Sequence, residues 1–390
     1  MKICILSSFE DSMQKRSGAS VRIYNLAKNL AANGNDVQVI VPGRQNSSEF
    51  VEGVSVLGFR GFSPRIVLEL LTKFVDIGRP TSLYFYDFLF ILQISDLVRE
   101  ADIVQIEQQS SGGLLIPFIR RVLRKPVVVD CHDVFQALRI KHTSIPRRIL
   151  ETFLEKLAYK NADLILTVSK AEKERLASVV NSYNIEVISN GVDTNFFQKS
   201  TGLNSIRELY GLGSCRIVVF VGNLDYPPNR EAVNALSSIA RRVLHEVENV
   251  KFLVVGKTRV KLQSSNLIFT GFVDNVSDVL CISDVAVAPL FHGSGTRLKI
   301  LEYFSCSLPV VSTSIAAEGL DFQDGVSIYI EDDLERFASR IIELLGNKNL
   351  SLAMGKAGRE IAATTYDWKN ITKKLESCFF QVLSKRYREA

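Results

Sequence analysis

One segment of the sequence, residues 289–302, combines small residues, cations and a carboxylate within a short stretch. It follows the apolar run Val285–Ala288, which predicts a strand, and it leads into residues with helical spacing. The turn carries three small residues in succession: Ser294, Gly295 and Thr296. Small residues at a helix start leave the amides of the first turn accessible, and these amides favour an anion. The segment therefore predicts an anion site.

The charged residues of the same segment narrow the kind of anion. Arg297 and Lys299 supply two cations beside the predicted helix start, which suits a diphosphate. Glu302 follows at the next turn, where its carboxylate could accept hydrogen bonds from two ribose hydroxyls. The alternative is a glycine-containing loop that leads into a helix with solvated charges.

A second group of polar residues, Asp130, Cys131, His132 and Asp133, comes at the end of the apolar run that starts at Val127. A histidine at the end of a strand can donate a hydrogen bond to a sugar hydroxyl or to a phosphate oxygen. The alternative is a structural histidine that caps the next helix. We interpret His132 as a functional residue.

Two glycines mark weaker candidate sites. Gly18 lies between a predicted strand and a predicted helix, where it could let a ligand approach the helix amides. Gly222 opens a loop after the first strand of the second half of the chain. A plain turn, or a rigid loop with Asn229 as a helix cap, explains these positions equally well. The sequence has no G-x-G-x-x-G motif, which argues against a dinucleotide-dependent dehydrogenase.

The elements that must position these residues alternate between strands and helices. This pattern predicts βαβ units, parallel sheets and two doubly wound α/β halves hinged near residues 190–205. Ligands of such sheets bind beyond the carboxyl ends of the strands, and two facing halves would form a cleft there. The predicted strands are Ile3–Ser7, Val37–Val41, Ile103–Ile106, Val127–Asp130, Leu164–Val168, one near residue 184, Ile217–Val221, Phe252–Val255, Leu267–Phe269, Val285–Ala288 and Val310–Ser312. Ala19–Asn33 is predicted as a helix that stops at Gly34, with Val21, Leu26 and Leu30 on its apolar side.

The bulk composition is that of an ordinary globular protein. The 390 residues are 46% hydrophobic and 23% charged, with a formal net charge of +5, which is too small for a dedicated nucleic-acid binder. Six cysteines without a C-x-x-C pair, and no signal peptide at the start, predict a cytoplasmic protein. The apolar stretch Leu83–Ile94 is too short to span a bilayer, which needs about 20 apolar residues.

Several motifs together resemble those of the retaining glycosyltransferases of family 4. The motifs are Val187–Asp193, Val221–Leu224, Val254–Gly256, Phe269–Val273, Gly293–Glu302 and Pro309–Thr313. The resemblance covers nearly the whole chain and implies the GT-B fold of two facing Rossmann-like domains. The version of the motif with Gly-Ser-Gly-Thr-Arg-Leu-Lys resembles a subgroup tied to cell-surface polysaccharide synthesis.

The resemblance implies three parts of the chain and their roles. Residues 1–195 would bind the acceptor, residues 206–365 would bind the nucleotide sugar, and residues 366–390 would form a helix that crosses back, with Trp368 at the crossover. The residues implied to bind the donor are Gly18, Gly222, Val273, Ser294, Gly295, Thr296 and Glu302, and those implied to act in catalysis are His132, Arg297 and Lys299. No metal and no cofactor besides the nucleotide-sugar substrate is expected.

Two positions depart from the family pattern. The family carries two glutamates with seven residues between them, but here Ser294 stands at the first position and only Glu302 is present. The family often has an Arg/Lys pair after the first strand of the second domain, where this chain has the segment 226–230 instead. We therefore expect Arg297 and Lys299 to neutralise most of the donor diphosphate.

The acceptor is predicted only by class, as a glycan or a lipid-linked glycan. Residues 59–100 are rich in aromatics, and residues 139–160 are basic and amphipathic. These features fit peripheral contact with the anionic inner face of a membrane. An ordinary core helix with a solvated charged face fits the same pattern.

Two other functions are compatible with this architecture. A sugar-nucleotide 2-epimerase shares the two-domain plan, although the motifs are more similar to those of the transferase. A non-catalytic subunit that supports a partner enzyme would explain the missing first glutamate. The retained Glu302, Arg297, Lys299 and His132 argue against such a subunit, because a scaffold needs no diphosphate site.

Overall fold

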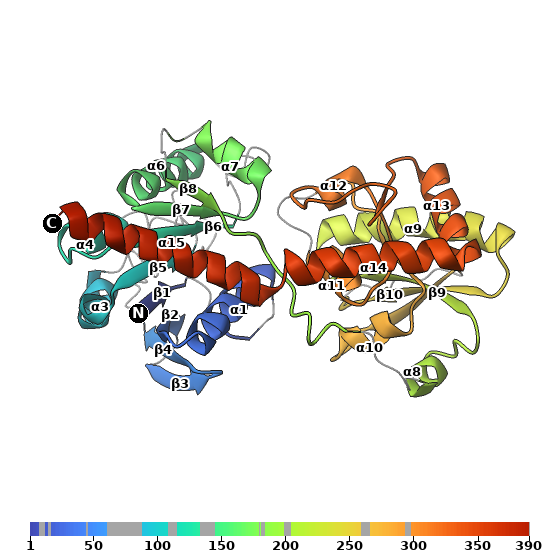
Figure 1. Cartoon of the computed structure of the whole chain (residues 1–390), viewed down its shortest axis with the longest axis horizontal. Coiled ribbons are helices and arrows are strands. Elements are labelled where there is room, and N and C mark those ends of the chain that lie inside the picture. The colour runs from blue at the N-terminus through green and yellow to red at the C-terminus, as the bar shows by residue number, and fades with distance from the viewer. Residues whose placement is uncertain are drawn as a thin grey trace. The chain divides into compact units, whose positions relative to one another are not determined.

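The computed structural model divides the chain into two compact units. Unit 1 comprises Met1–Ser189 and Ile371–Ala390, and unit 2 comprises Asn190–Asn370 (Figure 1). The structure describes residues 1–7, 12–14, 17–43, 46–60, 88–107, 115–132, 145–178, 180, 184–198, 204–258, 266–292 and 298–389. The predicted acceptor and donor roles of the two halves stay predictions.

Unit 1 is built on an eight-stranded sheet whose central strands are buried. In spatial order the strands are β3 (Ser47–Val51), β4 (Val54–Arg60), β2 (Asp36–Gly43), β1 (Lys2–Leu6), β5 (Ile103–Glu107), β6 (Val127–Cys131), β7 (Leu164–Thr167) and β8 (Ile185–Val187). Runs such as Val127–Val129 have no exposed side on either face, which is why they read as continuous apolar stretches. The sheet therefore confirms the predicted parallel strands of a doubly wound unit around β1, β5 and β6.

One edge of this sheet differs from the all-parallel prediction. β3 pairs with β4 in antiparallel register, with Val51 opposite Val54. Glu52 and Gly53 connect them and both have positive φ, 52° and 83°. A two-residue turn with positive φ at both positions matches the twist of a hairpin. The hairpin was missed because β3 is an exposed edge strand without an apolar run.

Capping residues and glycine mark helix ends in unit 1, as the first helix illustrates. The helices of this unit are α1 (Gly18–Ala32), α3 (Phe88–Glu100), α4 (Leu115–Arg121), α6 (Ile145–Asn161), α7 (Lys170–Ala177) and most of α15 (Trp368–Glu389). Ser17 and Ser20 form a capping box at the start of α1, and Gly34 follows its end with φ of 88°. α15 runs across unit 1 and ends beside α4 (Figure 1).

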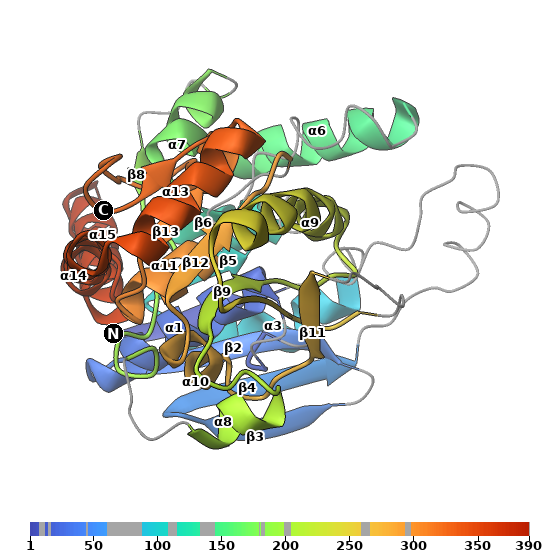
Figure 2. The same ribbon diagram turned by 90° about the vertical axis from the view of Figure 1, so that its right-hand side faces the viewer.

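Unit 2 contains a six-stranded sheet in which every pair is parallel. In spatial order the strands are β11 (Leu267–Gly271), β10 (Val250–Val255), β9 (Arg216–Val221), β12 (Val285–Ala288), β13 (Val310–Ser312) and β14 (Tyr329–Ile330). Its helices are α8 (Asn204–Leu209), α9 (Pro227–Glu246), α10 (Val276–Cys281), α11 (Leu298–Ser305), α12 (Ser314–Ala317), α13 (Leu334–Gly346) and α14 (Lys348–Thr364). α9 and α13 lie side by side (Figures 1 and 2).

Helix α11 is fixed in unit 2 from several directions. The buried hydroxyl of Tyr303 accepts a hydrogen bond of 2.8 Å from the amide of Val221 at the end of β9. The guanidinium of Arg359 in α14 donates to the carbonyl of Ser305 at 2.6 Å and to that of Thr194 at 3.0 Å. These bonds hold the helix that carries Lys299 and Glu302 against the carboxyl end of the sheet.

The segment that enters unit 2 runs beside the segment that leaves it. The amide of Val192 donates to the carbonyl of Tyr366 at 2.8 Å, and the amide of Trp368 donates back to the carbonyl of Val192 at 3.3 Å. Trp368 is buried at this point. The side chains of Thr194 and Asp367 are also hydrogen-bonded. Hydrogen bonds therefore join the first and last segments of unit 2.

We predict that Gly355→Ala in α14 destabilises the protein, although alanine normally favours a helix over glycine. A Cβ at residue 355 would lie 2.1 Å from the carbonyl oxygen of Ser307, a backbone atom that cannot move aside cheaply. The expected loss is about 1–3 kcal/mol in the free energy of unfolding, measured by chemical denaturation.

The matched control is Gly346→Ala at the end of α13, where a Cβ would meet nothing within 4 Å. We expect no loss of stability for this variant. Equal effects of the two substitutions would contradict the close packing of α14 on the residues after α11.

Candidate functional site

The carboxyl ends of β9 and β10 approach so closely that Gly256 is required, and the side chain of Asn229 requires a second glycine beside it. A Cβ on Gly256, which has φ of 152°, would lie 1.8 Å from the carbonyl oxygen of Gly222. A Cβ on Gly222 would in turn lie 2.8 Å from Cγ of Asn229. The predicted site residue Gly222 therefore offers backbone rather than side chain at this edge of the sheet, where parallel α/β sheets bind ligands.

Asn229 joins this edge to helix α11. Its Nδ2 donates to the carbonyl of Asn223 at 2.8 Å, and its Oδ1 accepts from Nζ of Lys299 at 2.9 Å. The interpretation of Asn229 as a helix cap is wrong, because Tyr226 is the N-cap residue of α9 and no side chain caps the helix. Asn229 instead holds the ammonium group of Lys299 at the strand ends.

Lys299 and Glu302 lie one turn apart on α11. The ammonium of Lys299 also lies over the ring of Phe220, 4.2 Å from its centre. Burial raises the pKa of Glu302 to about 7, although the charge of Lys299 opposes this shift. The carboxyl therefore binds a proton up to neutral pH, and hydrogen-bond donors such as ribose hydroxyls would favour its charged form.

Of the remaining residues predicted to form the site in unit 2, the structure describes only one. Val273 follows β11 and is half-buried against the core of unit 2. Four residues of the small-residue turn, Ser294, Gly295, Thr296 and Arg297, lie outside the described residues, and so does Asp133 in unit 1. Their predicted contacts with a diphosphate stay predictions.

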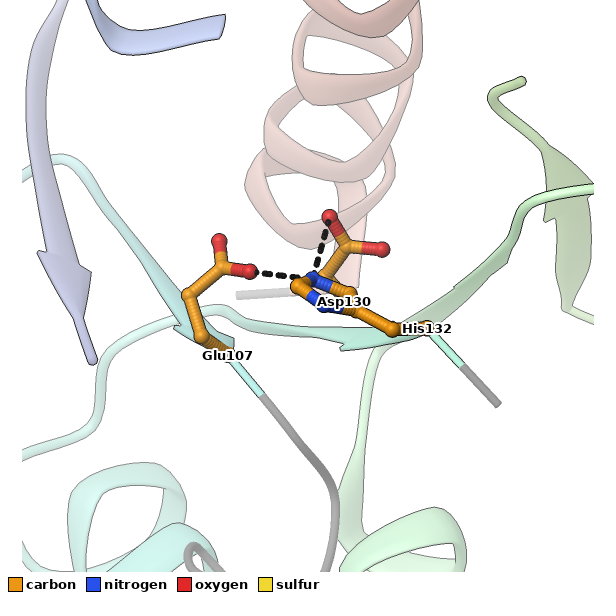
Figure 3. Close-up of side chains that lie close together, drawn as sticks. All are labelled: Glu107, Asp130 and His132. Carbon is orange, nitrogen blue, oxygen red and sulfur yellow. Dashed lines mark hydrogen bonds and ion pairs between the residues drawn. The ribbon is translucent and has the colours of Figure 1, made fainter. Parts of the chain in front are cut away.

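In unit 1, His132 meets a carboxylate from the neighbouring strand. Figure 3 shows Glu107, the last residue of β5, and His132, which follows β6, pointing toward each other. Nε2 of His132 lies 2.7 Å from Oε2 of Glu107 and 3.8 Å from Oδ2 of Asp130 (Figure 3). His132 therefore does not serve only as a cap for the following helix. Glu107 was missed by the sequence analysis, although a charged residue that ends an apolar strand is a signal for it.

Arg22 of α1 completes the cluster. Its Nε and Nη2 donate to the two carboxylate oxygens of Asp130 at 2.8 Å and 3.0 Å, and its Nη1 donates to the carbonyl of Ser189 at 3.0 Å. The side chains of Arg22 and Asp130 are 1% and 0% exposed. Removing one partner of such a buried pair costs about 3–5 kcal/mol. The pair thus fixes the carboxyl end of β6 and with it His132.

The charges of this cluster balance when His132 is protonated. Burial alone would lower the pKa of His132, but the hydrogen bond with Glu107 and the charges of Asp130 and Glu107 outweigh it and raise the pKa. Burial and the charge of Asp130 raise the pKa of Glu107. Within the described part of the chain His132 makes both contacts through Nε2. In the protonated imidazole Nδ1 also has a proton, which it can donate to a ligand.

The side chains of Glu107, Asp130 and His132 each offer an atom that could bind a metal ion, and these atoms lie within 4.8 Å of one another. The fit is poor. Both oxygens of Asp130 already accept from the guanidinium of Arg22, and Oε1 of Glu107 accepts from Gln105 at 2.6 Å. A cation of this kind beside the ligands repels a metal ion. The carboxylates of the cluster instead bind the side chains of Arg22 and His132.

Gly18, the other predicted residue of unit 1, is the first residue of α1 and is exposed. The amide of Ser20 in this first turn donates to the hydroxyl of Ser17 at 3.2 Å. Contact between Gly18 and a ligand stays a prediction.

Comparisons with known proteins identify the family. The model for Glycosyltransferase Family 4 matches residues 16–196, and the model for Glycosyl transferases group 1 matches residues 215–347. A GDP-mannose-dependent alpha-(1-6)-phosphatidylinositol monomannoside mannosyltransferase of Mycolicibacterium smegmatis is 24% identical over 318 residues, 75% of this chain and 80% of the relative. The capsular polysaccharide biosynthesis glycosyltransferase CapM of Staphylococcus aureus is 23% identical over 289 residues, 69% of this chain and 74% of CapM.

Solved structures agree on the fold. Sucrose-phosphate synthase from Thermosynechococcus elongatus superimposes with a TM-score of 0.74 at 16% identity, covering 99% of this chain and 100% of that one. Anabaena HepE in complex with UDP gives a TM-score of 0.72 at 16% identity, covering 98% and 100%. The chain has the GT-B fold and belongs to the glycosyltransferases, its N-terminal part to Glycosyltransferase Family 4 and its C-terminal part to the group 1 glycosyl transferases.

Proposed function

We propose that this enzyme transfers a sugar from a nucleotide-sugar donor to a glycan or lipid-linked acceptor, with retention of configuration at the anomeric carbon. The observation that carries the proposal is the arrangement on α11. Lys299 is held by Asn229 at the carboxyl ends of the strands of unit 2, and Glu302 lies one turn away with a raised pKa. This is the pairing of cation and carboxyl that a nucleoside diphosphate needs.

Each part of the donor has a proposed partner. The ammonium of Lys299 and the guanidinium of Arg297 neutralise the diphosphate, and the backbone at Gly222 lets it approach the sheet. Glu302 accepts the ribose hydroxyls. As the diphosphate leaves, its developing negative charge meets cations that are already in place, which is how preorganised electrostatics lowers a barrier. The proposal needs no metal ion for this step.

His132 acts on the sugar of the donor. Its position is fixed by Glu107, and its Nδ1 proton is available for a hydrogen bond to a sugar hydroxyl. The leaving phosphate accepts the proton of the acceptor hydroxyl, so the reaction needs no separate protein base.

The names of relatives support an acceptor used in polysaccharide or glycolipid synthesis. One relative is a capsular polysaccharide glycosyltransferase and another acts on a phosphatidylinositol mannoside. These comparisons differ on the donor base, because that mannosyltransferase is GDP-mannose-dependent and HepE was solved with UDP. Both nucleotides therefore belong in any binding experiment.

The exposed side of α6 supports peripheral contact with a membrane. Ile149 is 64% exposed and Phe153 is 58% exposed, and the exposed Lys156 and Lys160 continue the same side of the helix. Apolar side chains beside lysines suit an anionic lipid surface. Of the described helices, none is long and apolar enough to cross a membrane. We propose a cytoplasmic enzyme that rests on the inner face of a membrane.

The first prediction of this proposal is nucleotide binding that depends on Glu302. UDP or GDP should raise the melting temperature of the wild type, and at a concentration about 100-fold above Kd the gain is about 2.7 kcal/mol. Glu302→Ala should abolish the shift, whereas Glu208→Ala, an exposed glutamate of the same unit, should keep it. No shift of the wild type with either nucleotide would favour a non-catalytic subunit.

The second prediction concerns stability in the absence of nucleotide. Because the folded pKa of Glu302 lies near 7 and the ordinary value is 4.5, the folded state keeps a proton that the unfolded state releases. Wild-type stability should therefore fall between about pH 4.5 and pH 7 through this group. Glu302→Gln removes the effect, so its advantage over the wild type should grow across this range by about 1–3 kcal/mol and then stay constant. An advantage that is independent of pH in denaturant titrations would refute the assignment.

The third prediction separates His132 from the nucleotide site. His132→Ala should lower kcat about 100-fold while the affinity for UDP or GDP stays the same, because the residues proposed for the nucleotide belong to unit 2. His245→Ala, an exposed histidine at the end of α9, is the matched control and should retain full activity. Loss of nucleotide affinity in His132→Ala would contradict the division of roles.

The fourth prediction tests the membrane contact. Replacing Ile149 and Phe153 with serine should weaken partitioning onto vesicles that contain anionic lipid about tenfold, because two apolar side chains lose their burial in lipid. Leu209→Ser in unit 2, at a residue that is 73% exposed, should leave partitioning unchanged. Wild-type protein that does not pellet with anionic vesicles would end the idea.

A further inference from the structure

Unit 1 contains a pocket at the edge of its sheet opposite to His132. The pocket has a volume of about 610 Å³ and lies where β7 and β8 begin, between α4 and the last turns of α15. His132 and Glu107 stand at the carboxyl ends of β6 and β5, and neighbouring parallel strands have their amino ends at the other edge. The pocket is therefore separate from the site described above.

Cations dominate the lining of this pocket. Four positively charged side chains line it, from α4 and α15: Arg120, Arg121, Lys385 and Arg386. Two carboxylates, those of Asp163 and Glu186, line it as well. The balance leaves two positive charges in excess, which favours an anion in the pocket.

The ion pairs inside the pocket leave part of this positive charge without a close carboxylate. Asp163 accepts from the amide of Val127 at 2.8 Å and pairs with Arg120 at 3.0 Å. Nη1 of Arg386 is 3.7 Å from Asp163, which is too far for a hydrogen bond, and this nitrogen is buried without an acceptor. A buried donor of a guanidinium without an acceptor is rare in proteins and points to a bound water or anion.

Arg386 is thus only weakly paired with Asp163, and two other cations of the pocket have no partner among the described residues. Within the described residues, Arg121 and Lys385 make no hydrogen bond and no ion pair. Both side chains are exposed, so their donors are accessible to a ligand that enters the pocket beside the buried Nη1 of Arg386. Guanidinium groups bind phosphate through two parallel hydrogen bonds, which a small halide or a single carboxylate matches less well.

We propose that this pocket binds a phosphate-bearing anion with two or more negative charges. The ligand is a phosphomonoester or a diphosphate, which comes either from a soluble molecule or from a lipid headgroup. Its oxygens accept from Nη1 of Arg386 and from the side chains of Arg121 and Lys385. This site is additional to the nucleotide site of unit 2 and does not depend on the proposed function.

The experiment is a calorimetric titration of the full chain with inorganic pyrophosphate. The test variant replaces Arg121 and Lys385 with alanine, which should leave the fold intact because both side chains are exposed and bond to none of the described residues. Its matched control replaces Lys348 and Lys356, two exposed lysines of α14, and changes the net charge equally. Lys299→Ala removes the donor-site cation instead.

We expect the wild type and the α14 control to bind pyrophosphate equally, and the Arg121/Lys385 variant to lose one binding event or weaken it at least about tenfold. Lys299→Ala should retain that event. Absence of pyrophosphate binding in the wild type, or binding that is lost in Lys299→Ala and intact in the pocket variant, would overturn the proposal.

Vesicles then distinguish the two sources of the phosphate. Phosphatidylcholine vesicles with and without phosphatidic acid are pelleted with the wild type and with the Arg121/Lys385 variant. Weaker pelleting of the variant that appears only with phosphatidic acid supports a lipid headgroup. Pelleting that is the same for both proteins, together with the calorimetric result, supports a soluble phosphate.

Discussion

The half of this enzyme that is predicted to bind the donor depends on the close approach of two backbone turns. Gly222 and Gly256 allow the ends of β9 and β10 to lie together, and any Cβ on Gly256 would collide with the carbonyl oxygen of Gly222 at 1.8 Å. Asn229 occupies the space above Gly222 and binds Lys299. Helix α11 is in turn held to β9 by Tyr303 and to α14 by Arg359. The position of the one described cation of the predicted diphosphate site therefore follows from steric limits several residues away.

The charged side chains of the two units have different kinds of partners. In unit 1, Arg22, Asp130, Glu107 and His132 form a buried cluster that neutralises itself, so its cost of desolvation is offset internally. In unit 2, Lys299 has a neutral amide and an aromatic ring as partners, and Glu302 is raised in pKa rather than paired. The first arrangement fixes the position of one side chain. The second places a cation and a carboxyl of raised pKa one turn apart on α11.

Patterns that depend on neighbours in sequence were predicted well from the sequence. Continuous apolar runs predicted the central strands, and the helical spacing after residue 297 predicted α11, whose role at a donor site stays a prediction. Contacts between segments that are distant in the sequence could not be predicted from such local patterns. Arg22 lies in the same helical row as Leu26 and Leu30, so its charge was not recognised as a buried partner of Asp130, and Val21, predicted on that side, is only half-buried. A cap role for Asn229 stayed open as an alternative, because its contact with Lys299, 70 residues later, could not be read from the sequence.

The most direct test of this account is amide hydrogen exchange of the full chain with and without a saturating nucleoside diphosphate. If the donor site lies at the carboxyl edge of unit 2, the nucleotide should slow exchange in α11 and in residues 222–229, and the effect should disappear in Glu302→Ala. Slower exchange confined to unit 1, or no change in these segments while the nucleotide is bound, would contradict the assignment of the donor site.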